Sequence, residues 1–281
     1  MDNKKNILIT GITGSLGRAL CNELVKYDKY EIYGIYNSEQ KFAFFKRYNL
    51  FKKIKCFKMN IADSNFQSEF DKLTKIYKFD YIIHSAAMKH VDICEDNPIL
   101  AVNTNIIASN SLIECAKINN IENIIALSTD KSIEPCNIYG YSKLIMQKLI
   151  LNNGYSVYQG ANFFWSDGSV LDVWMNQMNR KQILTVTNIN HKRYFNTLNH
   201  ISKIIIKNLD VKGEIILPDY VYIIKLKDLL TAFMEYFDYH HYKIVGVESY
   251  EKDIEELDEV ISIRIEIDVP KIKELIEEYF N

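Results

Sequence analysis

The sequence contains little proline and glycine, with four and ten residues respectively among 281. Such low counts argue against long disordered linkers and low-complexity segments. A disulfide framework or a zinc site also lacks support, because the five cysteines are odd in number and form no Cys-x-x-Cys pair. We therefore expect reduced thiols, no bound metal, and a sizeable core built from the 48% of residues that are hydrophobic.

A strong charge of either sign is missing as well. The formal net charge is −2 at neutral pH, which gives no general attraction to nucleic acid or to an anionic membrane. Residues 1–6 are polar and carry no apolar signal sequence, and no apolar run approaches the roughly 20 residues of a membrane span. We expect a cytoplasmic protein whose partners include neither nucleic acid nor a membrane.

The segment 41–58 is a local exception to this even charge, because it holds seven basic residues and five phenylalanines. Binding of nucleic acid is one interpretation of such a composition. The favoured interpretation is an amphipathic helix followed by a strand, since lysine stems commonly lie over apolar surface.

Apolar β-type segments alternate with segments of helical spacing through the first half of the chain. This alternation predicts an α/β fold of the Rossmann type, with a doubly wound parallel sheet covered by helices on both faces. It weakens beyond about residue 153, so we expect a dinucleotide-binding domain over 1–157 and a smaller mixed α/β, substrate-binding region over 158–281. The elements expected in the first domain are strands at Ile7–Thr10, Tyr30–Tyr36, Cys56–Met59, Tyr81–His84 and Ile124–Ser128, and helices at Ser15–Tyr27, Phe66–Tyr77, Pro98–Asn119 and Tyr139–Asn152.

A glycine-rich loop follows the first expected strand and opens the first expected helix. Glycines at this spacing allow a tight turn, a close approach to a pyrophosphate, and close packing of the helix on the sheet. The helix N-terminus then offers N–H groups to the anion. The pattern predicts a bound NAD or NADP, although a tight turn without a ligand is the alternative. The residues expected to contact this cofactor are Gly11, Thr13, Gly14, Ser15, Leu16 and Gly17.

The end of the second strand contacts the adenosine ribose in such folds, where an acidic residue favours NAD and an arginine favours NADP. This chain has Asn37 there, between a tyrosine and a serine, so the choice stays open. Lys41, Lys46 and Arg47 are candidates to reach a 2′-phosphate. Asp63, after the third strand, is expected either to contact the adenine or to cap a helix.

Two residues four positions apart, Tyr139 and Lys143, share one face of an expected helix. A nearby ammonium and a positive nicotinamide ring stabilise a phenolate, which lowers the tyrosine pKa from about 10. Tyr139 is therefore expected to remove a proton from a hydroxyl while hydride leaves the same carbon. Thr129, or its neighbour Ser128, would form a hydrogen bond with that oxygen. The alternative is that Tyr139 is an ordinary aromatic residue at a helix start.

An acid and a base, Asp130 and Lys131, directly follow this threonine. Simple oxidation needs neither group beside the redox centre. Elimination of water from a sugar needs both, because oxidation at C4 acidifies the C5 proton, a base removes it, and an acid protonates the departing C6 hydroxyl. The pair therefore indicates a dehydratase, with a surface ion pair in a loop as the alternative.

Five segments carry a recognisable pattern: His84–Val91, Glu95–Pro98, Asn103–Asn105, Leu127–Lys131 and Asn137–Lys143. Together they resemble the UDP-N-acetylglucosamine 4,6-dehydratase family of extended short-chain dehydrogenases/reductases. The resemblance is dense from about residue 5 to residue 150 and weaker beyond. It implies an NAD(P)-dependent lyase of polysaccharide biosynthesis that acts on UDP-N-acetylglucosamine or a close relative. NADP is slightly favoured, and one branch of the family also epimerises C5.

The resemblance also assigns roles to residues and to subunit contacts. It places the catalytic positions on Thr129, Asp130, Lys131, Tyr139 and Lys143. It adds cofactor contacts at Ser85, Ala86, Ala87 and Asn105, with Tyr139 and Lys143 also touching the cofactor, and substrate contacts at Lys89, Asn162 and Arg193. The tyrosine is typical of the branch without a membrane anchor. Helices at 98–119 and 139–152 commonly pair between subunits in this family, which predicts a homodimer or a higher homo-oligomer.

Three positions depart from the family pattern. Gln159 stands where the family has an arginine, and Asn60 stands where it has an aspartate on the adenine side. Glu248 replaces the arginine that would meet the diphosphate, and a carboxylate repels such an anion. Either another cation compensates or the substrate differs from that of the family. The candidates for compensation are Arg193, Lys252 and Arg264.

Two other functions stay open at the level of the sequence. A nucleotide-sugar epimerase or 4-keto reductase of the same superfamily needs only Tyr139 and Lys143. A non-catalytic dinucleotide-binding subunit is consistent with the altered distal positions. It would leave the carboxylate and amine of Asp130 and Lys131 without a purpose, so we rank it below the enzymes.

Overall fold

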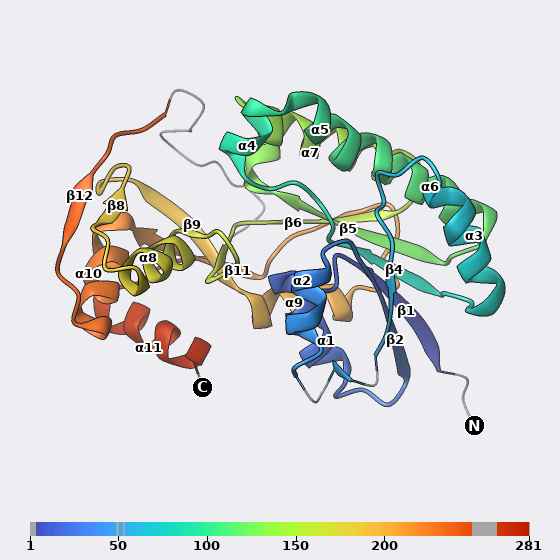
Figure 1. The fold of residues 1–281 in the computed structure, drawn as a ribbon, viewed down its shortest axis with the longest axis horizontal. Helices are drawn as coiled ribbons and strands as arrows, with labels where there is room; N and C mark the ends of the chain where they lie inside the picture. Colours follow the sequence, from blue (N-terminus) through green and yellow to red (C-terminus); the bar gives the residue numbers. More distant parts are fainter. Residues whose placement is uncertain (1–3, 49–50, 53, 249–262, 281) are drawn as a thin grey trace. The chain divides into compact units, whose positions relative to one another are not determined.

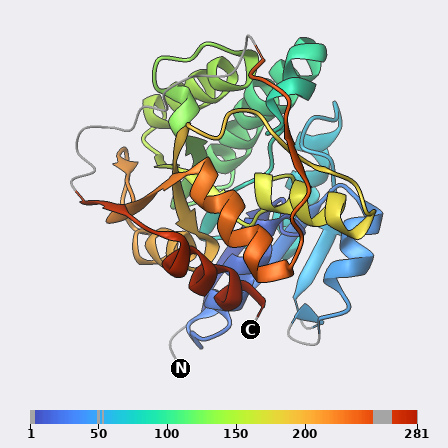
Figure 2. The ribbon, with the colours of Figure 1, turned by 90° about the vertical axis from the view of Figure 1, so that its left-hand side faces the viewer.

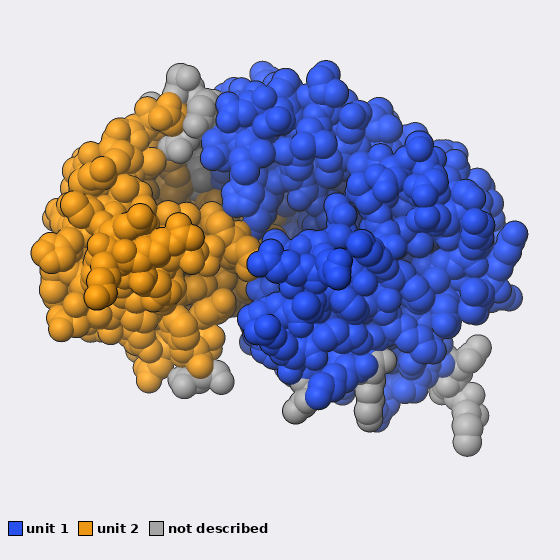
Figure 3. Space-filling view, viewed as in Figure 1, with its two compact units in different colours: residues 1–159, 199–217 blue, residues 160–198, 218–281 orange. Residues whose placement is uncertain are grey.

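The computed structural model describes residues 4–48, 51–52, 54–248 and 263–280. The chain forms two compact units, unit 1 with residues 1–159 and 199–217 and unit 2 with residues 160–198 and 218–281 (Figure 3). The observed division differs from a single break after residue 157, because the segment 199–217 returns to unit 1. The binding roles assigned to the two parts stay predictions.

A seven-stranded sheet forms the centre of unit 1, in the order β10-β6-β5-β4-β1-β2-β3. The pairs β1–β2, β1–β4, β4–β5, β2–β3 and β6–β10 are parallel. The strands are β1 (Lys5–Thr10), β2 (Tyr30–Tyr36), β3 (Lys55–Lys58), β4 (Tyr81–His84), β5 (Asn123–Thr129), β6 (Ser156–Gly160) and β10 (Ile215–Ile216). The predicted Rossmann-type parallel sheet is thereby confirmed.

Helices cover both faces of this sheet (Figure 1). One face carries α1 (Ser15–Leu24), α2 (Glu39–Phe45) and α9 (Leu198–Lys207), and the other carries α3 (Phe66–Ile76), α4 (Val91–Asp96), α5 (Pro98–Val102), α6 (Ala108–Ile118) and α7 (Ile138–Asn152). Double coverage explains the apolar runs of the central strands, since both faces of a parallel sheet are buried. In β1, for example, Ile7, Leu8 and Ile9 are all fully buried.

Two expected helical segments differ in detail from the structure. The helix predicted over 98–119 is interrupted by a π-helical turn, η2 (Asn103–Ile107), between α5 and α6. Such turns concentrate at functional sites, and this one carries Asn105 with only 1% of its surface exposed. The suggestion that Asp63 caps a helix is wrong, because α3 begins at Phe66 and its N-cap residue is Asn65.

The basic and aromatic segment 41–58 has the predicted architecture, with α2 at its start and β3 at its end. Ser38 caps α2 by accepting a hydrogen bond from the backbone N–H of Lys41. The Lys46 ammonium lies 5.6 Å from the centre of the Phe42 ring. Lysine side chains over aromatic surface thus account for much of the unusual composition.

Unit 2 has its own sheets and its own core. A four-stranded sheet has the order β13-β11-β9-β7, and a second sheet pairs β12 with β8. Its strands are β7 (Asn162–Phe164), β8 (Leu184–Val186), β9 (Lys192–Thr197), β11 (Tyr220–Lys225), β12 (Tyr242–Ile244) and β13 (Ile263–Glu266). Its helices are α8 (Val170–Asn179), α10 (Leu226–Phe237) and α11 (Val269–Phe280), of which α10 and α11 lie side by side (Figure 2). The core residues Trp174, Phe233 and Leu275 are buried among these elements.

Among the helices that the structure describes, none combines the length and the apolar character that crossing a membrane requires.

Candidate active site

The glycine-rich loop connects β1 to α1 through a tight turn. Gly11 has a φ of +69°, and a side chain there would meet the backbone of Ala86 at 3.0 Å. The Gly14 N–H donates to the Gly11 carbonyl at 2.9 Å directly before α1 begins. Among the described residues, none caps α1 with its side chain, and none in its first turn is acidic. These features suit a pyrophosphate. The other predicted loop residues, Thr13, Ser15 and Leu16, are buried in the same turn.

Gly17 explains why α1 can lie so close to this loop. A Cβ atom at this position would lie 2.6 Å from the Gly11 carbonyl oxygen and would also meet the Ile12 carbonyl oxygen. Both neighbours are backbone atoms, which have little freedom to move. We expect Gly17→Ala to displace α1, to lower the free energy of unfolding by about 1–3 kcal/mol, and to weaken dinucleotide binding about tenfold or more.

Fluorescence titration with the reduced dinucleotide and thermal unfolding would measure these two effects. Asn22→Ala, on the exposed side of the same helix, is the matched control and should leave binding unchanged. Unaltered binding by Gly17→Ala would contradict the assignment of this loop to the cofactor.

The end of β2 lies next to the three candidate cations for the ribose side of the cofactor. The Lys46 ammonium donates to the backbone carbonyls of Lys52 at 3.3 Å and Ile54 at 3.2 Å. The Arg47 guanidinium lies over the Phe44 ring, 5.9 Å from its centre. Asn37 directly follows β2, Lys41 lies in the first turn of α2, and both side chains are exposed.

Two further residues assigned to the adenine side contact one another. The side chain of Asp63 accepts a hydrogen bond from the amide of Asn60 at 2.6 Å. Asp63 is exposed and Asn60 is partly buried. The resemblance implies an aspartate at the position of Asn60. The amide of Asn60 instead binds the carboxylate of Asp63 in the same loop.

The end of β4 lies directly beside the glycine-rich loop. The Ser85 hydroxyl donates to the Thr10 carbonyl at 2.7 Å, and the Ala86 N–H donates to the Thr10 hydroxyl at 3.3 Å. The predicted cofactor residues 85–87 and 11–17 are thus neighbours, although they lie some 70 positions apart in the chain. Parallel pairing of β1 with β4 brings them to the same edge of the sheet.

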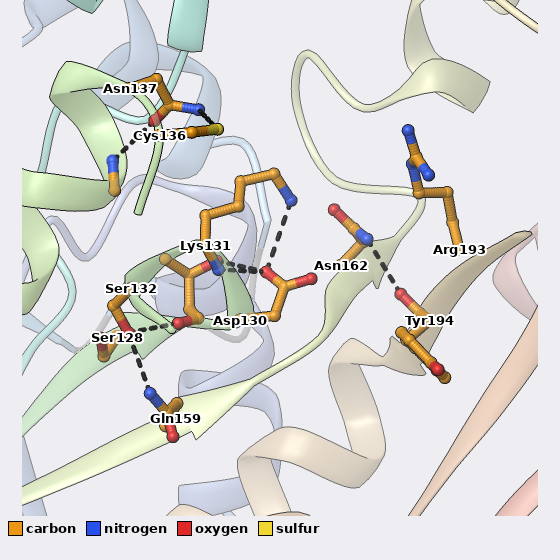
Figure 4. Close-up of polar contacts among 12 residues, drawn as sticks. Ser128, Asp130, Lys131, Ser132, Cys136, Asn137, Gln159, Asn162, Arg193 and Tyr194 are labelled. Atoms are coloured by element: carbon orange, nitrogen blue, oxygen red, sulfur yellow. Dashed lines mark hydrogen bonds and ion pairs between the residues drawn. The ribbon is translucent and has the colours of Figure 1, made fainter. Parts of the chain in front are cut away.

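The predicted acid and base occupy a short 3-10 turn, η3 (Asp130–Ser132), at the end of β5. The carboxylate of Asp130 accepts hydrogen bonds from the Thr129 hydroxyl at 2.6 Å and from the Lys131 N–H at 2.9 Å. The Lys131 ammonium lies 3.4 Å from the same oxygen (Figure 4). The side chain of Asp130 is only 1% exposed and that of Lys131 is 23% exposed. The pair is therefore not a solvated surface ion pair.

Tyr139 contacts this turn from the first residues of α7. The side chain of Thr129 lies within interaction distance of the Tyr139 hydroxyl. Burial raises the pKa of Tyr139 to about 12, the charge of Lys131 opposes this rise, and the charge of Asp130 adds to it. The pKa therefore moves in the direction opposite to the expected one. Within the protein alone, the loss of hydration outweighs the attraction of a phenolate to nearby cations.

Lys143 lies one helical turn beyond Tyr139 and is 5% exposed. Burial lowers the pKa of Lys143 to about 7, because an ammonium is costly in a dehydrated environment. At neutral pH this side chain exists both as an amine and as an ammonium, which allows it to exchange protons.

A chain of buried side chains connects the glycine-rich loop to α7. The His84 ring contacts the Thr10 hydroxyl at 2.8 Å through Nδ1 and the Ser109 hydroxyl at 2.9 Å through Nε2. Ser109 donates to the Asn105 carbonyl at 2.8 Å, and the Asn105 amide donates to Ser142 at 2.9 Å. Burial, with the nearby charge of Lys143, lowers the pKa of His84 to about 3, so the ring is neutral.

Sequence reasoning missed a second contact at the start of α7. The backbone N–H of Ile138 donates to the Glu95 carboxylate at 2.6 Å, and the Gly140 N–H donates to the Asn137 side chain at 2.8 Å. Both acceptors satisfy N–H groups that a helix start leaves unpaired. The segment 95–98 was part of the family resemblance, but neither its spacing nor the resemblance indicated a role for this glutamate.

The residues predicted to contact the substrate come from both units. Lys89 is exposed between β4 and α4 in unit 1. In unit 2, the amide of Asn162 donates to the Tyr194 carbonyl at 3.0 Å, and the Arg193 guanidinium contacts the His191 ring at 2.8 Å.

Three cations were predicted to compensate for the family arginine that this chain lacks. Of these, Arg193 and Arg264 lie within the described residues. The Arg264 guanidinium lies 5.9 Å from the centre of the Tyr194 ring, and Glu248 is exposed. The candidate Lys252 lies outside the described residues, as does the rest of 249–252. Among the described residues, no group of three histidine, cysteine or acidic side chains is placed to hold a metal ion.

Comparison with known proteins connects this geometry to a family. A family model described as "Polysaccharide biosynthesis protein" matches residues 7–275. The chain belongs to this family. The inverting UDP-N-acetylglucosamine 4,6-dehydratase of Campylobacter jejuni is 32% identical over 264 residues, which cover 90% of this chain and 77% of that protein.

Two other relatives carry different descriptions. The uncharacterized membrane protein MJ1061 of Methanocaldococcus jannaschii is 31% identical and covers 82% of this chain and 71% of its own length. The UDP-glucose 4-epimerase of Rickettsia bellii is 32% identical, over 69% of this chain and 59% of that protein.

Solved structures show that the fold is shared. Pen from Bacillus thuringiensis has a TM-score of 0.83 at 23% identity and covers 98% of this chain and 99% of its own. The dTDP-glucose 4,6-dehydratase DesIV from Streptomyces venezuelae, solved with NAD bound, has a TM-score of 0.77 at 15% identity, covering 96% and 90%. At these identities the likeness concerns the architecture.

Proposed function

We propose that this chain is an NAD(P)-dependent nucleotide-sugar 4,6-dehydratase acting on UDP-N-acetylglucosamine or a close relative. One observation carries the proposal: Asp130 and Lys131 form a buried acid–base pair on the turn whose threonine contacts Tyr139. The dehydratase of Campylobacter jejuni, the most fully covered of the three relatives described, supports the same chemistry.

Oxidation at C4 of the sugar would use Tyr139, Thr129 and Lys143. When bound, NAD(P) accepts hydride from C4 and later returns it to C6. Tyr139 removes the proton of the C4 hydroxyl, and Thr129 holds that oxygen by a hydrogen bond. The high pKa of Tyr139 in the protein alone requires an added positive charge to form a phenolate, and an oxidised nicotinamide ring supplies one.

Elimination would use the pair on η3. In its neutral form Lys131 takes the C5 proton, while the protonated carboxyl of Asp130 gives its proton to the C6 oxygen as the C–O bond breaks and water leaves. Lys131 is then protonated and Asp130 is ionised. A proton transfer from the ammonium back to the carboxylate, across the observed 3.4 Å, restores both groups. As hydride returns to C6, C5 would take up one proton, which balances the proton that Tyr139 removed from the C4 hydroxyl. Uptake on the opposite face of C5 would give the inverted sugar.

The product of the reaction tests the proposal. Purified protein, incubated with UDP-N-acetylglucosamine and with UDP-glucose in parallel, should convert one of them to a 4-keto-6-deoxy sugar lighter by one water. Mass spectrometry measures the loss, and NMR of the product gives the configuration at C5. Recovery of both sugars unchanged at high enzyme concentration would contradict the proposal.

A nucleotide-sugar 4-epimerase is the second candidate, favoured by the 32% identity with the Rickettsia epimerase. This reaction needs the tyrosine and lysine of α7 but not the acid–base pair. The same incubation separates the two functions, since epimerisation leaves the mass of the sugar unchanged.

The cofactor side of the proposal favours NADP. No carboxylate directly follows β2, and we assign the 2′-phosphate to Lys41, which is exposed in the first turn of α2 and is the first of the three candidate cations after β2. We expect Lys41→Ala to weaken NADPH binding about tenfold, the scale of one charged hydrogen bond, and to leave NADH binding unchanged. Titration of both cofactors measures this, with Arg47→Ala as the control. Equal losses for both cofactors would overturn the assignment.

We also propose that the protein forms a homodimer through helices of unit 1. The helical run of α5, η2 and α6 and the neighbouring α7 expose large apolar side chains, which monomers rarely leave in water. They are Ile99 (72% exposed), Ile118 (60%), Ile107 (55%), Leu100 (52%), Tyr141 (51%) and Ile145 (46%).

We expect Ile99→Glu/Ile145→Glu to dissociate this dimer, because two buried charges per protomer are costly in an apolar interface. Sedimentation velocity would show the wild type as a dimer and the variant as a monomer. Ile183→Glu, an equally exposed isoleucine of unit 2, is the control. A monomeric wild type would contradict the proposal.

A further inference from the structure

A buried cluster of amide and hydroxyl groups lies directly beneath the turn that carries the acid–base pair. It joins Ser128 and Ser132 near the end of β5, Gln147 on α7 and Gln159 on β6. Each of these four residues has at most 5% of its surface exposed. Their sequence positions gave no indication of contact, since Gln159 lies 27 residues beyond Ser132.

The hydrogen bonds of this cluster converge on the hydroxyl of Ser132. Ser132 donates its only proton to the Thr129 carbonyl at 2.6 Å. The same oxygen accepts hydrogen bonds from the Gln159 amide at 2.9 Å and from the Ser128 hydroxyl at 3.2 Å (Figure 4). A hydroxyl has one donor and two acceptor positions, so Ser132 is saturated.

Gln159 uses both protons of its amide nitrogen in this cluster. One goes to Ser132, and the other goes to the Gln147 side-chain oxygen at 3.3 Å. The reverse orientation of the amide would place its oxygen against the oxygen of Gln147. Of the two donors to Ser132, the Gln159 amide is the closer, and Ser132 in turn donates to the Thr129 carbonyl.

We infer that Gln159 is a positioning residue, whose amide holds η3 through Ser132 and so fixes the carboxylate and amine of Asp130 and Lys131. This inference rests on the proposed dehydration. An amide suits the position, because the buried donors it provides carry no net charge that would disturb the adjacent acid–base pair.

Gln159→Met tests the inference, because methionine has the same chain length but cannot donate a hydrogen bond. Ser132 and Gln147 then each lose a donor in a buried environment. We expect kcat for dehydration to fall about tenfold or more, with KM and cofactor affinity unchanged. Hydrogen exchange of the segment 129–133 should be about tenfold faster than in the wild type. If this variant does not fold, Gln159→Glu replaces it, because its carboxylate keeps the shape of the side chain but donates no proton to Ser132 or Gln147, and the same losses are expected.

A paired exchange provides the rescue. Gln159→Arg alone buries an unpaired charge and should lower kcat at least as much as Gln159→Met. Gln147→Glu/Gln159→Arg supplies a carboxylate for the guanidinium and keeps donors directed at Ser132, so it should recover most of the lost activity.

Asn123→Leu is the matched control for a purely structural effect. Asn123 is a buried amide at the opposite end of β5, where it donates to the carbonyls of Leu209 and Val211. Its replacement should lower the thermal stability but leave kcat and the exchange of 129–133 unchanged.

The outcomes separate the inference from the proposed function. Wild-type kcat and wild-type exchange in Gln159→Met would overturn the inference, as would a loss of activity no greater than that of Asn123→Leu. If the wild type dehydrates no sugar, the proposed function fails by itself. The exchange of 129–133 in Gln159→Met then decides alone whether this amide holds the turn.

Discussion

Asp130→Asn is expected to lower the rate of 4-keto-6-deoxy sugar formation by about 10²–10⁴-fold, the range typical for loss of a general acid. Asparagine keeps the hydrogen-bond acceptor for the Thr129 hydroxyl and the Lys131 N–H, so the turn should persist. It cannot give a proton to the departing C6 hydroxyl. Oxidation at C4 does not involve this group and should continue.

The two half-reactions can be followed separately in this variant. Fluorescence of the reduced cofactor should rise on addition of the sugar and remain high, because hydride is taken up but not returned. Mass spectrometry should show almost no loss of water. Asp28→Asn, at an exposed turn between α1 and β2, is the control. Undiminished dehydration in Asp130→Asn would exclude Asp130 as the acid, and intact epimerisation with no dehydration in the wild type would favour the second candidate.

Tyr139→Phe is expected to abolish the first half-reaction as well as the second, with a loss of about 10²–10⁴-fold. In the proposed mechanism the phenol oxygen is the base for the C4 hydroxyl proton, and phenylalanine removes that oxygen alone. No reduced cofactor should accumulate when the sugar is added, in contrast to Asp130→Asn. This contrast identifies the step that each residue serves.

Tyr141→Phe is the matched control, since this second phenol of α7 is 51% exposed and lacks a lysine four positions on. Sugar binding by Tyr139→Phe should stay close to that of the wild type, because the ring remains. Appearance of reduced cofactor at the wild-type rate would show that another group removes the proton.

The spacing of the proposed catalytic residues along the chain accounts for part of the arrangement of the site. Tyr139 and Lys143 are four apart on one helix, and Thr129, Asp130 and Lys131 are consecutive. The spacing of four places Tyr139 and Lys143 on one face of a helix, since a helix repeats every 3.6 residues, and the second set is held together by its direct succession in the chain. The contact between the two sets, through the Thr129 and Tyr139 side chains, depends on how α7 packs against the end of β5.

The pKa of Tyr139 shows where sequence reasoning fails. The sequence shows positive charges near Tyr139, which predict a lowered pKa. It does not show that the phenol is buried, and burial raises the pKa of Tyr139 to about 12. The two effects oppose one another, and only the packing around the phenol decides between them. The low pKa of the Lys143 ammonium has the same cause.

The sequence by itself determined the alternation of strands and helices, the tight turn at Gly11, and the residues that can supply an acid, a base and a phenol. These properties follow from periodicity, from backbone freedom and from side-chain chemistry, all of which are local. Only the tertiary structure decided that Gln159 lies beneath the catalytic turn, that Glu95 holds the start of α7, and that residues 199–217 belong with unit 1. The physical reason is that such contacts join residues from separate elements, and the hydrogen bonds of buried polar groups are fixed only when those elements pack together.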